Sequence, residues 1–111
     1  MKMSWKVATT ICLAAIASIP AIAQTNGQNK GMDVYQSKCQ MCHGENGAGD
    51  TPAGRAIKAS SFKSPALMQA SDATLIAAVR NGKGRMPSYS GRLTEAQIKA
   101  AVAYIRKLQH S

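Results

Sequence analysis

Two cysteines and a histidine stand together in the stretch CQMCH, where Cys39 and Cys42 are three residues apart and His43 follows directly. On a helical turn, residues at i, i+3 and i+4 project from one face, so the two thiols and the imidazole share a side. Such a cluster is typical of three kinds of site: a zinc site, a thiol pair or disulfide, and a covalently attached haem. Each kind needs different supporting residues, so the rest of the chain decides between them.

The first 23 residues have the pattern of a cleaved secretory signal peptide. Two lysines precede an uncharged, largely apolar run at residues 7–19, which is shorter than the roughly twenty residues of a membrane span. Ala21 and Ala23 then provide a small-residue cleavage pattern. We therefore expect export, cleavage after Ala23 and a mature domain of residues 24–111, with an uncleaved membrane anchor as the alternative.

The expected mature chain is small and poor in aromatic residues. It has 88 residues, two cysteines and no tryptophan, and loss of two lysines lowers the net charge from +9 to +7. A domain of this size buries a modest fraction of its surface. With few large apolar side chains, it needs a staple or a large bound cofactor to complete a core. Its aromatic residues are Tyr35, Phe62, Tyr89 and Tyr104.

The three kinds of site differ in how well the mature chain supports them. A structural zinc site takes four ligands, usually Cys or His, and beyond the motif the only Cys or His of the mature chain is His110. A thiol redox pair favours a βαβ setting, and no strand pattern is visible; a local disulfide in an exported protein stays open. Cys-x-x-Cys-His is the attachment signature of c-type haem. We therefore predict one haem c, bonded through its vinyl groups to Cys39 and Cys42, with His43 as a ligand of its iron.

Helical periodicity marks three segments, and no segment alternates like a strand. A first helix is expected over residues 31–41, leading into the motif, after a polar segment at 24–30 that we expect to fray. A second is expected over residues 71–82, with a serine N-cap and a terminal glycine. The third, over residues 94–109, opens with a capping box and carries an apolar stripe.

Two long loops separate these helices, at residues 44–65 and 82–92, and both are rich in glycine and proline. A compact domain rarely keeps about twenty residues without regular structure, and wrapping a flat cofactor would give a reason for them. A short turn is expected at Leu67 and Met68. The sequence therefore predicts an all-α fold, with three to four short helices and Gly/Pro-rich loops around one covalent haem.

A methionine is the candidate for the second axial position on the iron. Met41 lies inside the attachment motif, Met32 is close to it in sequence, and Met68 suits a role as core filler. Met86 stands in a loop where two preceding glycines allow close approach to a flat surface and a following proline stiffens the backbone. We favour Met86 as the ligand. The alternative is a surface methionine, with the iron open or bound to water.

From residue 31 to residue 108 the chain resembles the small soluble single-haem class I cytochromes c, and the bacterial and photosynthetic carriers more than the mitochondrial protein. The resemblance rests on the CQMCH motif, on the MPSY stretch at residues 86–89 and on Tyr104. It implies a fold in which the first and last helices cross near the haem edge. Gly31 and Tyr35 match the family's small-plus-aromatic pattern on the first helix.

In members of this family the haem site includes two further hydrogen bonds, and the resemblance suggests candidate residues for both in this sequence. Many relatives have a tryptophan that donates to a haem propionate, and because the mature chain has none, the candidates are Arg55, Lys58 and Lys63. In the family, the second nitrogen of the proximal imidazole donates to a loop carbonyl, which orients the ring. For His43 the candidate acceptor is the carbonyl of Pro52.

A His/Met pair saturates the iron, and methionine ligation raises its reduction potential. We therefore expect a periplasmic one-electron carrier rather than an enzyme, a monomer with no membrane span in the mature chain. Its positive charge, including Lys83 and Arg85 beside Met86, predicts redox proteins with acidic docking faces as partners. Export and the lack of a basic–aromatic array argue against nucleic acid. The alternatives are an open-iron haem enzyme or gas sensor, and a cytochrome subunit fixed in a larger redox complex.

Overall fold

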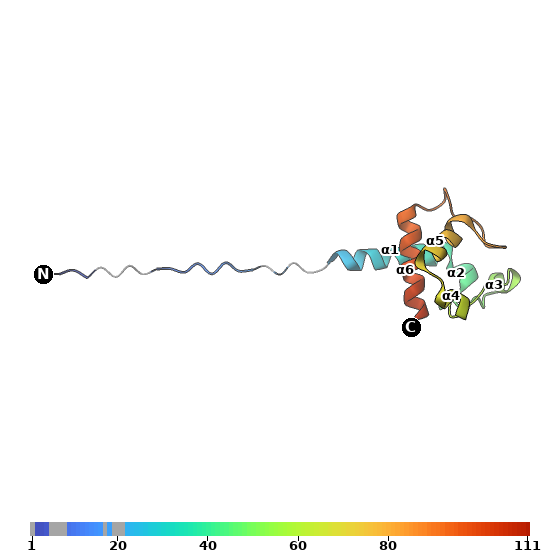
Figure 1. Ribbon diagram of the computed structural model, residues 1–111, viewed down its shortest axis with the longest axis horizontal. Coiled ribbons are helices and arrows are strands. Elements are labelled where there is room, and N and C mark those ends of the chain that lie inside the picture. The colour runs from blue at the N-terminus through green and yellow to red at the C-terminus, as the bar shows by residue number, and fades with distance from the viewer. Residues whose placement is uncertain (1, 5–8, 17, 19–21) are drawn as a thin grey trace.

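A computed structural model describes residues 2–4, 9–16, 18 and 22–111 of the chain, and all its regular structure is helical (Figure 1). No strand occurs in these described residues, which contain only two isolated bridges in the loop after α5. The prediction of an all-α fold is therefore confirmed. The helices are α1 (Ile22–Lys38), α2 (Gln40–His43), α3 (Pro52–Ala56), α4 (Pro65–Gln69), α5 (Asp72–Asn81) and α6 (Glu95–Gln109).

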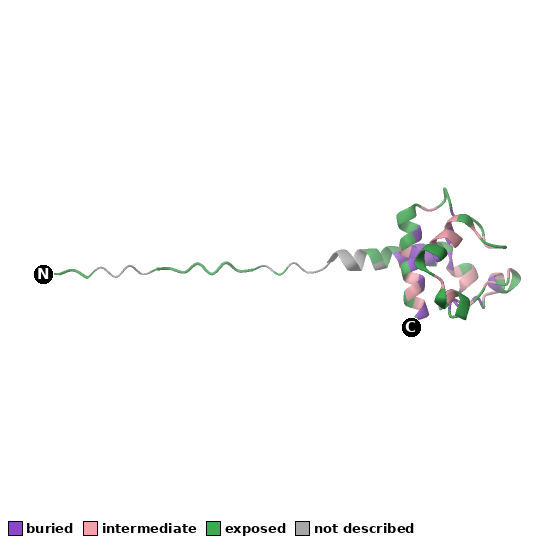
Figure 2. Ribbon diagram, in the orientation of Figure 1, coloured by how far each residue is buried: buried purple, intermediate pink, exposed green. Residues whose placement is uncertain are grey.

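The fold is organised around the crossing of α1 and α6, where buried residues gather (Figures 1 and 2). Gly31 lets the two backbones approach closely, because a Cβ atom at this position would lie 2.3 Å from the carbonyl oxygen of Ala100. Next to this contact, the rings of Tyr35 and Tyr104 pack with their centroids 5.2 Å apart. The expected crossing of the first and last helices is confirmed.

Helix α6 supplies one side of the core and forms where its sequence signals predict. The Thr94 hydroxyl accepts from the backbone N–H of Gln97, whose side chain in turn accepts from the N–H of Thr94, so the capping box is complete. Four residues on one face of the helix are then buried, as the apolar stripe predicted. They are Ile98, Ala101, Val102 and Ile105.

Helix α5 packs against α6 and is capped as expected. The Ser71 hydroxyl accepts from the N–H of Thr74, and Leu75 and Val79 are buried. At the other end, Gly82 takes a φ of 77°, in the left-handed region that favours glycine. Two ion pairs join the helices, from Arg80 to Glu95 and from Arg106 to Asp72.

The first helix differs from the prediction at both ends. It begins at Ile22 rather than at Gly31, so the polar segment at 24–30, which was expected to fray, is helical. This stretch lacks proline, and a helix propagates easily once a neighbouring turn is formed. The helix also ends at Lys38, and the motif continues as the separate short helix α2.

The predicted structureless loop at 44–65 contains a short helix, α3, that the sequence analysis missed. Its signal was present: Pro52 occupies the first helical position, and the hydroxyl of Thr51 accepts from the N–H of Gly54. The expected turn at Leu67 and Met68 is helix α4.

The predicted signal-peptide region is only partly described. Residues 1, 5–8, 17 and 19–21 lie outside the described residues, and they include part of the proposed cleavage pattern. The described residues before α1 are exposed and have no regular secondary structure. Within the described ranges, no helix is both long and apolar enough to cross a membrane.

Two glycines of α1 allow a matched test of the helix crossing. Gly31→Ala should lower the free energy of unfolding by about 1–3 kcal/mol, because the new methyl group collides with the backbone of α6. Gly27 is exposed, and apart from its own helix no described residue lies within 4 Å of the position that a methyl group would take there. Gly27→Ala should therefore raise the free energy of unfolding by up to about 1 kcal/mol through helix propensity. Denaturant titration of both holoproteins checks this, and a neutral Gly31→Ala substitution would refute the close crossing.

Candidate functional site

A cavity of about 300 Å³, at the lower end of the range of small-molecule sites, lies between α5, α6 and the loops. Three of the four predicted haem-binding residues, Cys39, His43 and Met86, line it. Cys42 is half-buried and does not line it, although it lies one turn from Cys39. Much of the remaining wall is apolar, as a macrocycle requires. These apolar residues include Ile57, Phe62, Leu67, Leu75, Val79 and Ile105.

The CQMCH segment is held as a tight helical turn. The N–H groups of Cys42 and His43 both donate to the carbonyl of Cys39, at 3.2 and 3.0 Å. Two hydroxyl groups fix its carbonyls from outside: Thr51 donates to Met41 at 2.6 Å, and Tyr35 donates to Gly44, the residue after the motif, at 2.6 Å. The spacing of the motif therefore becomes a rigid local geometry.

The two thiols have neither the environment of a redox pair nor that of a metal site. Cys39 and Cys42 are both free. Burial, and then the nearby Cys42, raise the pKa of Cys39 to about 11, whereas reactive redox cysteines have depressed pKa values. In the part of the chain that the structure describes, no three His, Cys, Asp or Glu side chains cluster as metal ligands. The zinc and thiol-redox alternatives therefore gain no support.

The imidazole of His43 has the properties of an iron ligand. Its ring stacks on Phe62, with centroids 4.7 Å apart, and burial lowers its pKa, which favours the neutral, metal-binding form. Its Nδ1 atom is buried and has no hydrogen-bond partner among the described residues. The structure therefore lacks the predicted hydrogen bond to Pro52. A half-buried neutral imidazole in an apolar cavity that Cys39 also lines fits a haem group.

Met86 reaches the cavity from a compact turn after α5. The backbones of Lys83 and Met86 exchange two hydrogen bonds, of 3.2 and 2.9 Å. Gly82 permits this turn, because a Cβ atom there would lie 2.7 Å from the carbonyl oxygen of Met86. The Met86 side chain is half-buried and packs against the core cluster that contains Val79 and Tyr89.

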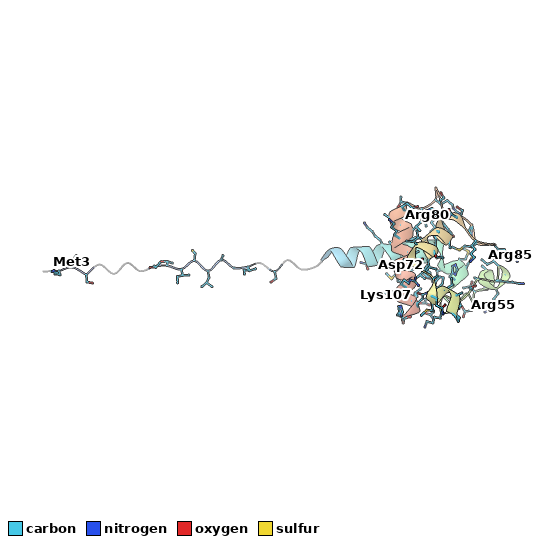
Figure 3. The ribbon with its side chains drawn as sticks, in the orientation of Figure 1. Met3, Arg55, Asp72, Arg80, Arg85 and Lys107 are labelled. Atoms are coloured by element: carbon cyan, nitrogen blue, oxygen red, sulfur yellow. The ribbon has the colours of Figure 1, made fainter. Side chains whose placement is uncertain are left out.

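Cationic side chains form part of the cavity wall. Lys58, Lys83 and Arg85 all line it, and Arg85 donates to the carbonyl of Ala56, which links the Met86 turn to α3. Figure 3 shows Arg85 and Arg55 on the same side of the domain, away from the crossing of α1 and α6.

The three candidates for a propionate contact differ in whether they line the cavity. Arg55 donates to the carbonyl of Asp50, and the ammonium group of Lys63 donates to the carbonyl of Ser111. Lys58 is the one of the three that lines the cavity. It adopts a φ of 58°, which costs free energy for a residue with a side chain.

Two residues that shape the cavity were not predicted from the sequence. Phe62 stacks on His43, and Gln109 is buried and donates from its side chain to the carbonyl of Phe62 at 2.9 Å. The signal for Gln109 was its position four residues after Ile105, on the buried stripe of α6. A polar residue at that position needs buried partners, which here are backbone carbonyls.

Comparison with known proteins gives concordant matches. Residues 26–105 match the family model described as cytochrome c oxidase, cbb3-type, subunit III. The chain is 37% identical over 81 residues to the cbb3-type cytochrome c oxidase subunit CcoP of Azospirillum brasilense. It is also 33% identical over 97 residues to cytochrome c6 of a Synechococcus strain, and 28% identical over 105 residues to cytochrome c6 of Thermosynechococcus vestitus.

These relatives differ in how much of their own length is matched. The alignment with CcoP covers 71% of this chain but only 28% of that protein. The alignments with the two cytochromes c6 cover 87% and 95% of this chain, and 82% and 91% of those proteins. The chain thus spans less than a third of the CcoP relative and most of each cytochrome c6.

Proposed function

Because the chain belongs to the cytochrome c family represented by subunit III of cbb3-type cytochrome c oxidase, we propose that it carries single electrons between redox proteins. Its cofactor is haem c, and it is an electron-transfer protein rather than an enzyme. The observation that carries the proposal is the apolar cavity in which Cys39, His43 and Met86 meet.

Each of the four residues has a defined role in this proposal. Cys39 and Cys42 would hold the haem through thioether bonds, and His43 and Met86 would be the ligands of its iron. The bound haem supplies a metal that alternates between the ferrous and ferric states. The protein contributes rigid ligands, so that little rearrangement accompanies electron transfer. It also excludes water, because most of the cavity wall is apolar.

Substitution of Met86 tests the ligand set. Met86→Ala should expose a coordination position, so that the reduced holoprotein binds carbon monoxide promptly, and its reduction potential should fall. Met41 provides the matched control, because its side chain is 78% exposed and is not part of the cavity wall. Absorption spectra of the oxidised, reduced and carbon-monoxide-treated proteins give the measurement.

The parent and Met41→Ala proteins should be six-coordinate and should not respond to carbon monoxide. A parent protein that binds carbon monoxide at once would reject Met86 as a ligand and favour an open-iron enzyme or sensor.

Covalent attachment of haem c requires export, and we propose that residues 1–23 direct the chain to the periplasm and are then removed. The supporting pattern is the lysine-flanked apolar run followed by Ala21 and Ala23. The mature domain then begins at Gln24, within the first turn of α1, and keeps the part of that helix that crosses α6.

Mass spectrometry of the exported holoprotein checks the cleavage. The mass should equal residues 24–111 plus one haem, joined by two thioether bonds. A product that retains residues 1–23 and fractionates with membranes would contradict cleavage and favour the anchored alternative.

We further propose that the partners present acidic faces and that the protein meets them as a monomer. The mature net charge of +7 and the cations Lys58, Lys83 and Arg85 at the cavity create a positive field near the haem. Such a field attracts an acidic surface and speeds diffusional encounter.

The dependence of the electron-transfer rate on salt concentration tests for this positive field. Oxidation of the reduced protein by the anion hexacyanoferrate(III) should slow as ionic strength rises, because salt screens the attraction. Lys83→Gln should lower the rate at low salt and flatten the dependence. Lys99→Gln, which removes an exposed lysine of α6 that does not line the cavity, should leave both nearly unchanged. A rate independent of salt in the parent protein would remove electrostatic steering from the proposal.

The similarity to CcoP favours a second candidate, a cytochrome domain that works while fixed in an oxidase complex. Both candidates use the same haem site and differ only in the lifetime of the contact with the partner. Retention of the protein in a purified oxidase complex would favour the second candidate, and recovery as a free monomer favours the carrier.

A further inference from the structure

The Met86 turn is tied to the attachment motif by one side chain, that of Tyr89. The Tyr89 hydroxyl donates to the carbonyl of Lys38 at 2.9 Å, across 51 positions of the sequence. Lys38 is the last residue of α1 and directly precedes Cys39. A residue three positions after Met86 therefore contacts the backbone next to the first attachment cysteine.

The ring and the backbone of Tyr89 are also held in place. Its ring is buried in the cluster that includes Val79 and Ile98, and its N–H donates to the carbonyl of Val79 at 3.1 Å. Met86 packs against the same cluster. Burial raises the pKa of Tyr89, so its hydroxyl remains a protonated donor at neutral pH.

Other hydrogen bonds of this loop go to partners outside the attachment motif. The hydroxyl of Ser88 donates to the carbonyl of Arg80 at 2.6 Å, and Arg85 donates to Ala56. Among the hydrogen bonds of the described residues, that of Tyr89 is the one that joins residues 83–93 to residues 38–44. The Met86 turn and the end of α1 that leads into the motif therefore depend on it for their direct polar contact.

We propose that Tyr89 is a positioning residue, which holds the Met86 turn against the Cys39 end of α1 and so keeps the Met86 sulfur in reach of the iron. This inference rests on the proposed function, because it takes His43 and Met86 as the iron ligands. Without the hydroxyl, the turn keeps its contacts to α5 but loses its contact to the motif. States in which Met86 has moved away from the iron then become more populated.

Competition by imidazole measures this population. Imidazole binds the ferric iron only where Met86 has left it, so the apparent dissociation constant varies inversely with the fraction of open molecules. A hydrogen bond of this kind changes an equilibrium by roughly 2–12-fold. Tyr89→Phe should therefore lower the apparent dissociation constant for imidazole by roughly that factor, while the charge-transfer band of methionine-bound ferric haem persists without imidazole.

Tyr104 serves as the matched control, because Tyr104→Phe loses the same single atom. The Tyr104 hydroxyl makes no hydrogen bond within the described residues, whereas that of Tyr89 donates to Lys38. Tyr104→Phe should keep the imidazole affinity of the parent protein.

The outcomes are distinct. A Tyr89→Phe protein with parental imidazole affinity would overturn the inference, and so would an equal gain in affinity in Tyr104→Phe, which would indicate general loosening. Met86→Ala supplies the fully open reference. If the parent protein lacks the methionine charge-transfer band and binds imidazole like Met86→Ala, the proposed ligand set fails, and this result differs from a failure of the Tyr89 inference.

A second measurement applies if Tyr89→Phe yields little holoprotein. Genetic incorporation of 3,5-difluorotyrosine at position 89 keeps the ring and gives a more acidic hydroxyl, which stops donating once it ionises. Imidazole affinity should then rise through the pH range in which the modified side chain ionises. The same modification at position 104 should produce no such rise, and identical pH profiles at both positions would refute the inference.

Discussion

The close approach of α1 to α6 at Gly31 determines where the CQMCH motif lies. The backbone of Ala100 occupies the space that a side chain at Gly31 would need, so the two helices are fixed relative to each other. Because α1 ends at Lys38, its placement also places Cys39, and the short helix α2 then carries His43 to the cavity. A contact between two backbones thus positions groups more than one helical turn away.

Hydroxyl groups from three parts of the chain then hold the motif in place. Tyr35 belongs to α1, Thr51 precedes α3, and Tyr89 follows the Met86 turn, and each donates to a carbonyl within residues 38–44. Carbonyls at the ends of short helices lack partners within the helix, so side-chain donors satisfy them at little cost in entropy when the rings are buried. The CQMCH segment is therefore connected both to the loop that carries Thr51 and to the turn that carries Met86.

The features that were predictable from sequence are those that local signals encode. The capping box at Thr94, the stripe of α6 and the Cys-x-x-Cys-His spacing each specify structure within a few residues, and the fold agrees with them. Contacts between distant segments have no such signal. The partner of Tyr89 is 51 residues away, and Gln109 donates to the carbonyl of Phe62, which lies in a segment without periodicity. The α3 helix was missed for a different reason, because its Thr-Pro start lay within a glycine-rich stretch.

The two core clusters explain why a chain with so few aromatic residues folds around a cofactor. One cluster contains Leu75 and Val79, the other contains Cys39, Phe62 and Ile105, and all five residues line the cavity. A haem bound there would contact both clusters and bury apolar surface of each. Since a ligand that binds only the folded state adds its binding free energy to stability, the cofactor would act as part of the core. Covalent attachment at the CQMCH motif would make that contribution permanent.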